Sequence, residues 1–283
     1  VLTNTQLDRL CNIRYKGFKT IKLPMTSPLP TSPLGEEPDW DKAGEALRNA
    51  LDKLCKDAEE AVDNGYNYII LTDKMELLPQ GGGREGAFYI PSLLAVSAVH
   101  HYLIGVGKRV QTALIVESGE IREVMHAALL LGYGASAICP YMTFAVLDDL
   151  VKKHKIQEDY ATAEAHYIKA VDKGLKKIMS KMGISTIRSY RGAKIFESIG
   201  LSEDLLRRYF GTEVSTIGGI GLKEIARDAI RLQKKSLTPN PSPVGEGNTL
   251  LQNNGQFSWR KDGILHAWNP ETIANLQIAT RLS

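Results

Sequence analysis

Short apolar runs that alternate with amphipathic segments constrain the fold of this 283-residue chain more than any other feature. The runs have the length and composition of buried strands, and the segments between them carry apolar residues at three- and four-residue steps, as helices do. We expect strands at 18–23, 68–71, 112–116, 137–139 and just after Gly183. We expect helices at 41–64, 92–104, 120–131, 144–155 and 167–182, with three more near 190–199, 203–210 and 223–232.

Strands that alternate with crossover helices build a mainly parallel sheet with the helices packed outside it. Continuous apolar strands fit this arrangement, because both faces of such strands are buried. About five strand–helix units are too few for a regular eight-fold barrel. We therefore expect a single α/β domain that forms an incomplete or degenerate (β/α) barrel, with an open doubly wound sheet as the alternative.

The stretch 167–193 carries this pattern most clearly. Gly183 supplies the left-handed stop that a helix end often needs, and a very short strand follows it. Hydroxyl side chains and a guanidinium then crowd the end of that strand, and a second helix opens at Arg191. The apolar stripe of the first helix consists of Ile168, Val171, Leu175, Ile178 and Met182.

Composition and charge exclude several classes of partner. The chain is 43% hydrophobic and 24% charged, which is typical of a soluble globular domain. Its formal net charge of +3 is too small to predict binding to nucleic acid or to an anionic membrane. No window approaches the roughly eighteen apolar residues of a membrane span. Because the first residue is Val1 and not Met, we expect an excised piece or a processed product.

The cysteines and histidines predict no metal site. Cys11, Cys55 and Cys139 lie too far apart for a CxxC pair or a cluster-binding run, and a reducing compartment fits them better than a disulfide framework. His100 and His101 are adjacent, so on a helix they diverge by about 100°.

Two segments rich in Pro and Ser look inserted. Prolines lack the backbone donor that a helix or a central strand needs, so we expect surface loops there. The expected organisation is a central α/β domain at 1–236 with an insert at 27–38, a linker or insert at 237–256, and an arm and helix at 257–283. In the last segment Asn269 is expected to cap a helix that starts at Pro270.

Polar residues follow several of the expected strands. In parallel strands these ends gather on one edge, where ligand contacts are usually built. A buried carboxylate such as Glu117 needs a partner, and Arg122 and Arg191 are the candidates. The set could form a ligand or tunnel wall, or a buried ionic network that holds the loops; it contains no complete catalytic constellation.

One glycine-rich loop stands before an expected helix. Gly218, Gly219 and Gly221 precede a helix that begins near Leu222, so their amides could hold a phosphate. Tight packing is the alternative explanation of these glycines. The other glycine run, at 81–83, is followed by Arg84 and Glu85 and is therefore not a phosphate-binding P-loop.

Several long motifs occur in the order known from one enzyme family. They are IPSLLAV at 90–96, VESGEIREV at 116–124, LGYGA at 131–135, MSKMGIST at 179–186, SYRGA at 189–193, IGGIG at 217–221 and WNPET at 268–272. In this order they resemble the central region of the large chain of glutamate synthase. The resemblance covers essentially the whole chain apart from the two Pro-rich inserts.

The resemblance implies a role beside two catalytic domains. In this family glutamine yields ammonia in an amino-terminal amidotransferase domain. The ammonia passes through an internal tunnel to a flavin- and iron–sulfur-binding (β/α) barrel, where 2-iminoglutarate forms from 2-oxoglutarate and is reduced to glutamate. FMN and an iron–sulfur cluster are thus implied for the parent enzyme and no cofactor for this chain. The implied partners are those two domains, and the implied location is the cytoplasm, or the plastid stroma in a plant.

The resemblance carries over no catalytic residue, so we expect a scaffold and ammonia-tunnel wall. Two alternatives are an independent (β/α) enzyme on a phosphorylated small molecule, with Glu117 as its base and the glycine loop as its phosphate site, and a docking module that binds through the inserts. The candidate strand-end, tunnel-wall or interface residues are Asp73, Glu117, Ser118, Glu120, Arg122, Ser185, Thr186, Ser189, Tyr190 and Arg191.

Overall fold

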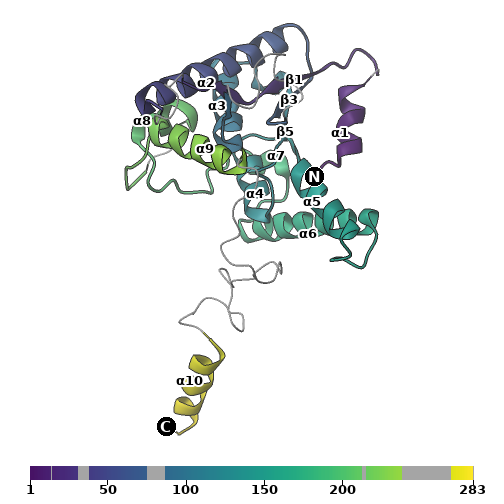
Figure 1. The fold of residues 1–283 in the computed structure, drawn as a ribbon, viewed down its shortest axis with the longest axis vertical. Coiled ribbons are helices and arrows are strands. Elements are labelled where there is room, and N and C mark those ends of the chain that lie inside the picture. The colour runs from purple at the N-terminus through teal and green to yellow at the C-terminus, as the bar shows by residue number, and fades with distance from the viewer. Residues whose placement is uncertain (14, 31–37, 75–86, 212–214, 238–268, 283) are drawn as a thin grey trace. The chain divides into compact units, whose positions relative to one another are not determined.

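The computed structural model describes residues 1–13, 15–30, 38–74, 87–211, 215–237 and 269–282 (Figure 1). The chain divides into two compact units, Val1–Leu237 and Thr238–Ser283. The strands of the first unit are β1 (Thr20–Pro24), β2 (Thr26–Pro28), β3 (Tyr68–Thr72), β4 (Ala87–Tyr89), β5 (Ala113–Glu117) and β6 (Ala137–Cys139). Its helices are α1 (Asn4–Cys11), α2 (Trp40–Asp63), α3 (Ser92–Gly105), α4 (Val124–Gly132), α5 (Tyr141–Lys152), α6 (Tyr160–Lys181), α7 (Ile187–Tyr190), α8 (Glu203–Tyr209) and α9 (Leu222–Leu237).

Four strands form a parallel sheet in the order β1-β3-β5-β6. This order follows the chain without reversal, whereas a doubly wound sheet has a point at which the strand order reverses. The structure therefore confirms the predicted α/β fold with a mainly parallel sheet. Of the two topologies considered, the sequential order favours the incomplete barrel.

The two faces of this sheet are covered by different helices. Leu71 and Val116 point to one face and pack in a single cluster with residues of α2, α3 and α4, the helices that follow β1, β3 and β5. Ile70 and Ile115 point to the other face, where they pack against Leu7 of α1 and Phe144 of α5. In Figure 1, α2 and α3 accordingly lie on one side of the strands, and α1 on the other.

A small antiparallel sheet joins β2 to β4, with Ser27 opposite Phe88. The prediction of a surface loop from residue 27 is wrong for the start of that segment, because Ser27 and Pro28 lie in β2 and Ser27 is fully buried. A two-stranded ribbon tolerates proline, since each strand has an edge that needs no donor. Residues 31–37 of the insert lie outside the described residues. Of the linker expected at 237–256, Leu237 is the last residue of α9, and 238–256 lie outside the described residues.

The region after α6 differs most from the prediction. Gly183 ends α6 with a φ of +68°, as expected, but no strand follows it among the described residues. Thr186 instead caps the short helix α7, because its hydroxyl accepts from the amide of Ser189 at 3.2 Å. Local hydroxyl–amide bonds of this kind compete with strand pairing. The helix expected at 190–199 is also wrong, since that stretch is irregular up to Gly200, which has a φ of +78°.

Several helices begin at residues other than those predicted: α5 begins at Tyr141 and not at 144, and α6 at Tyr160 and not at 167. The helix expected from residue 120 begins at Val124, because the side chain and amide of Glu120 are engaged elsewhere. On α6 Val171 and Leu175 are buried as predicted, whereas Met182 is 51% exposed and falls outside the buried stripe.

The second unit contains α10 (Pro270–Leu282). Its start confirms the predicted cap, since the amide of Thr272 donates to Oδ1 of Asn269 at 2.9 Å. The arm expected before this helix, at 257–268, lies outside the described residues. Among the helices that the structure describes, none is both long and apolar enough to cross a membrane.

Close packing of α4 on α6 yields a stability prediction. A Cβ added at Gly174 would lie 2.5 Å from Cγ2 of Val124, a β-branched side chain with little rotamer freedom. Overpacking costs roughly 1–3 kcal/mol and exceeds the gain of up to about 1 kcal/mol that alanine has over glycine in a helix. Gly174→Ala should therefore lower the free energy of unfolding by up to about 2 kcal/mol in urea denaturation.

Two variants make this test specific. Adding Val124→Ala to Gly174→Ala should restore part of the lost unfolding free energy, because it removes the Val124 methyl groups that the new Cβ would meet. Gly105→Ala, at the end of α3, should be neutral or stabilising, because nothing lies within 4 Å of its added Cβ. Equal effects at positions 105 and 174 would contradict the packing argument.

Candidate functional site

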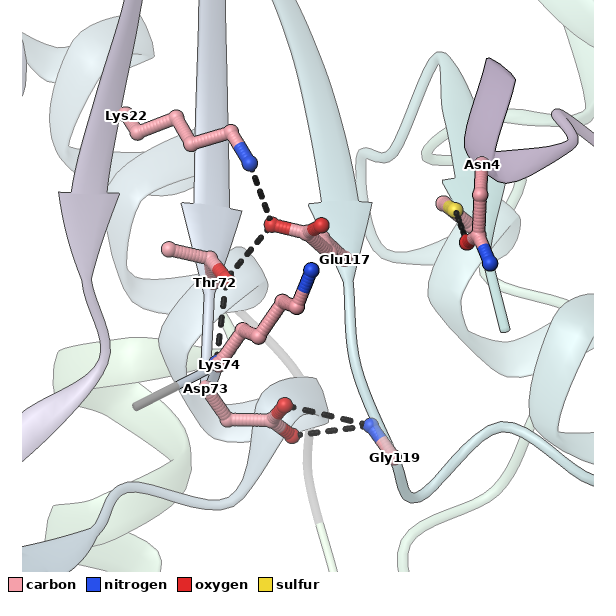
Figure 2. Close-up of polar contacts among 8 residues, drawn as sticks. Asn4, Lys22, Thr72, Asp73, Lys74, Glu117 and Gly119 are labelled. Carbon is pink, nitrogen blue, oxygen red and sulfur yellow. Dashed lines mark hydrogen bonds and ion pairs between the residues drawn. The ribbon is translucent and has the colours of Figure 1, made fainter. Parts of the chain in front are cut away.

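The carboxyl edge of the parallel sheet carries a buried carboxylate that links three strands (Figure 2). Glu117 ends β5 and is 3% exposed. Its Oε2 accepts from the ammonium of Lys22 on β1 at 2.9 Å and from the hydroxyl of Thr72 on β3 at 2.7 Å. One carboxylate oxygen therefore ties β5 to both strands on its side of the sheet.

Strand alternation explains this meeting. Thr72 lies opposite Glu117 in the register, and Lys22, two residues before the partner of Thr72 on β1, points to the same face. The long Lys22 side chain reaches across β3, as Figure 2 shows. Burial lowers the pKa of Lys22, but the hydrogen bond and the charge of Glu117 raise it more, so the pKa ends above its usual value.

The predicted partners of Glu117 are wrong. Arg191 donates from Nη1 to the hydroxyl of Ser136, which precedes β6 and so lies near the amino edge of the sheet. Arg122 is exposed in the turn before α4. Lys22 was missed because it lies 95 residues before Glu117. A lysine between Ile21 and Leu23 in an apolar strand was the signal that could have found it, since a buried ammonium requires an anion.

Asp73, the residue after β3, forms a second cluster. Its Oδ2 accepts from the hydroxyl of Ser118 at 2.6 Å, and the amide of Gly119 lies 3.1 Å from both carboxylate oxygens. Burial raises the pKa of the Asp73 carboxyl above its usual value, against hydrogen bonds from Ser118, Gly119 and Tyr141 that lower it. The cluster thus holds the loop after β5 against the end of β3.

Glu120 extends this network to α3. Its Oε2 accepts from the amide and the hydroxyl of Ser92 at 2.8 and 2.6 Å, and its own amide donates to the hydroxyl of Ser118. Pro91 offers no side-chain cap, so Glu120 supplies the acceptor that the first amide of α3 needs. The structure therefore joins Asp73, Ser118 and Glu120 in one chain of hydrogen bonds.

The predicted residues after α6 belong to other surroundings. Ser185, Thr186 and Ser189 are exposed at the end of α6 and on α7. Tyr190 is 1% exposed, and its hydroxyl donates to the carbonyl of Ala128 on α4 at 3.2 Å. None of these contacts reaches the Glu117 or Asp73 clusters.

The glycine loop at 217–221 packs against the segment around Gly200. The amide of Gly200 donates to the carbonyl of Ile217, and a Cβ on Gly219 would lie 2.1 Å from the carbonyl oxygen of Gly200. The amide of Gly221, at the start of α9, donates to Oε2 of Glu224 at 2.8 Å. Close packing thus accounts for Gly219, and a side chain of the helix itself already occupies one of the amides proposed for an anion.

The described residues do not fit an iron–sulfur cluster. Such clusters need thiolates gathered at one place, whereas Cys11, Cys55 and Cys139 lie on α1, α2 and β6. Burial raises the pKa of both Cys55 and Cys139 to about 12, so these thiols stay protonated. Within the described ranges no group of three or more His, Cys, Asp or Glu side chains could hold a metal ion.

Comparison with known proteins gives one consistent family. A family described as "Glutamate synthase central domain" matches residues 1–202. The large chain of NADPH glutamate synthase from Bacillus subtilis is 42% identical over 237 residues, which are 84% of this chain and 15% of that protein. Ferredoxin-dependent glutamate synthase from Pyropia yezoensis is 36% identical over 245 residues, 83% of this chain and 15% of that protein.

The chain is also similar to a third enzyme and to a solved structure. The NADH glutamate synthase of Schizosaccharomyces pombe is 36% identical over 237 residues, 82% of this chain and 11% of that protein. A flavocytochrome b2 with sulfite bound is 13% identical at a TM-score of 0.42, over 78% of this chain and 47% of that one.

The link between Lys22 and Glu117 generates the second prediction. Glu117→Gln leaves the Lys22 ammonium, whose side chain is only 24% exposed, without its counter-charge. Breaking such a pair should lower the free energy of unfolding by roughly 1–3 kcal/mol, less than for a fully buried pair because water reaches Lys22. In urea denaturation, the double variant Glu117→Gln, Lys22→Met should lose less unfolding free energy than the two single variants lose together.

A matched control exists on the surface. Glu203 pairs with Arg207 on α8, and both side chains are mostly exposed. Glu203→Gln should change the free energy of unfolding by less than about 0.5 kcal/mol. Two results would contradict the stabilising role of the Lys22–Glu117 pair. One is a loss of unfolding free energy at Glu203 as large as that at Glu117. The other is a double variant whose loss equals the sum of the two single losses.

Asp73 generates a prediction about pH. Because folding raises its pKa above 3.8, the folded state binds more protons than the unfolded state at pH values between 3.8 and the folded pKa. Stability from this group therefore increases as the pH falls through that window. In urea denaturation at pH 7 and pH 4.5, the stability advantage of the protein over Asp73→Asn should be larger at the lower pH. A constant difference would contradict the raised pKa.

Proposed function

This chain belongs to the glutamate synthase central domain family, and on that premise we propose that it joins the amidotransferase and flavin-binding domains of a glutamate synthase large chain. In such an enzyme it would serve as scaffold and as part of the wall of the ammonia tunnel, in the cytoplasm or in the plastid stroma of a plant. The chemistry that makes glutamate from glutamine and 2-oxoglutarate would take place in the neighbouring domains.

One observation carries this proposal. The similarity to the Bacillus subtilis large chain extends over 84% of this chain but only 15% of that protein. The chain spans an equally small share, 15%, of the Pyropia yezoensis enzyme. A segment of this size within a much longer chain leaves room for separate catalytic domains, which would supply the FMN and the iron–sulfur cluster.

The hydrogen bonds that occupy the carboxylates at this edge support a scaffold role and not a catalytic one. A general base needs a carboxylate that can approach a substrate proton. At the carboxyl edge Glu117 is held by Lys22 and Thr72, and Asp73 by Ser118 and Gly119. These bonds join strand ends to one another and so make this edge rigid, as a scaffold requires.

The same pairing suits a wall beside an ammonia path. A carboxylate that already accepts hydrogen bonds competes less for a passing ammonia molecule than an unpaired one. We place Asp73, Ser118 and Glu117 at this wall. The exposed hydroxyls of Ser185, Thr186 and Ser189, and the exposed Arg122, are assigned to contacts with the neighbouring domains.

A chimaera tests the connecting role. Replacing the matching segment of the Bacillus subtilis large chain by this chain should retain glutamine-dependent glutamate formation in the reconstituted enzyme. Deleting the segment should abolish it, even where glutamine hydrolysis continues. A chimaera that folds, hydrolyses glutamine, binds flavin and reduces 2-iminoglutarate from added ammonia, but makes no glutamate from glutamine, would contradict the proposal.

The same chimaera tests the wall. Glu117→Ala and Asp73→Ala should raise the amount of glutamine hydrolysed per glutamate formed and release free ammonia, because they open a bonded edge beside the path. Glu203→Ala, an exposed change on α8, should leave that ratio unchanged. An unchanged ratio in all three variants would remove these residues from the wall and leave the scaffold role standing.

A further inference from the structure

A hollow of about 500 Å³ opens at the amino edge of the parallel sheet. Its lining includes the residues that lead into three strands, namely Asn67 and Tyr68 at β3, Thr112 and Ala113 at β5, and Ser136 before β6. Its size falls in the roughly 300–1,000 Å³ range of small-molecule sites. The Glu117 and Asp73 clusters lie at the opposite ends of the same strands.

Three arginines and no carboxylate line this hollow. Arg109, Arg188 and Arg191 come from the 3₁₀ turn before β5, from α7 and from the residue after α7. Within the part of the chain that the structure describes, none of the three guanidinium groups forms an ion pair. Positive charge therefore accumulates here without an anion from these parts of the protein.

Arg109 is the buried part of this charge, at 8% exposure. It donates to Nδ1 of His100 at 2.8 Å and to the carbonyls of Thr112 and Gly134 at 2.7 Å each. All three acceptors are neutral, since burial and then the charge of Arg109 lower the pKa of His100 to about 3. Burial lowers the pKa of Arg109 to about 10, which still leaves it charged at neutral pH.

Arg191 adds an unsatisfied donor. Its Nη1 donates to the hydroxyl of Ser136 at 3.0 Å, while its Nε is buried and has no acceptor among the described residues. Leaving a charged donor buried without a partner is costly, so such a group usually marks a missing acceptor. The side chain of Arg188 on α7 is exposed and lines the same hollow.

We propose that this hollow binds a small anion with two negative charges, of the phosphate or dicarboxylate class. Arg191 and Arg188 contact the anion, and Arg109 supplies a fixed positive charge behind them. Guanidinium groups suit such ligands because their N–H donors match the oxygens of carboxylate and phosphate in pairs. The site goes beyond the connecting role and involves none of the residues placed at the tunnel wall.

The test uses the complete 283-residue chain in chloride buffer at constant ionic strength. Isothermal titration calorimetry with inorganic phosphate, and separately with succinate, should give saturable binding at one site for at least one of the two anions. Arg188→Gln and Arg191→Gln should each weaken binding about tenfold, because each removes a charge-assisted hydrogen bond. Binding of both anions would indicate a dicarboxylate-tolerant site, and binding of phosphate alone a phosphoryl site.

Arg207→Gln is the matched control. Arg207 is an exposed arginine on α8 paired with Glu203, away from the lining of the hollow, so affinity should stay within twofold. Arg188 is exposed and its loss cannot unfold the chain by leaving a buried gap, so that variant keeps the test valid even if Arg191→Gln is unstable. No saturable binding of either anion, or equal affinity in all three variants, would overturn the site.

Discussion

One carboxylate oxygen organises the carboxyl edge of this protein. Oε2 of Glu117 accepts from Lys22 and Thr72 and so connects β5 to β3 and β1 on the face that packs against α1 and α5. Burying a carboxylate and an ammonium is unfavourable unless each satisfies the other. The pairing therefore selects one register for three strands at once, because a slip of one residue would turn Glu117 or Lys22 to the opposite face, against α2, α3 and α4.

The two edges of the sheet differ in how they treat charge. At the carboxyl edge each carboxylate has donors, and the bonds run from Ser92 through Glu120 and Ser118 to Asp73. At the amino edge Arg109 and Arg191 are held only by neutral oxygens and a neutral imidazole. Hydrogen bonds among its own side chains fix the loops at the carboxyl edge, whereas the uncompensated positive charge at the amino edge favours binding of an anion. The carboxyl edge is the part of the sheet that we propose for the wall of the ammonia path.

Much of the fold could be predicted from the sequence, because its signals are local. The apolar runs at 68–71 and 112–116 and the stripe of Val171 and Leu175 reflect periodicities that burial imposes directly. The stretch after Gly183 could not be predicted in the same way, because the hydroxyl of Thr186 accepts from the amide of Ser189 and caps a short helix in place of the expected strand. At the site, Asp73, Glu117 and Ser118 were expected at strand ends and are found there. Their partners were not all expected, because contacts such as Lys22 with Glu117 depend on strand order and register.

The separation of Lys22 from Glu117 along the sequence has a consequence for synthesis on the ribosome. A chain leaves the ribosome at about 5–20 residues per second, so the 95 residues between them take roughly 5 to 19 s to appear. During that time β1 and β3 are both made, but the ammonium of Lys22 has no Glu117 carboxylate to pair with. The sheet therefore gains the carboxylate that links its three strands only when β5 has been made.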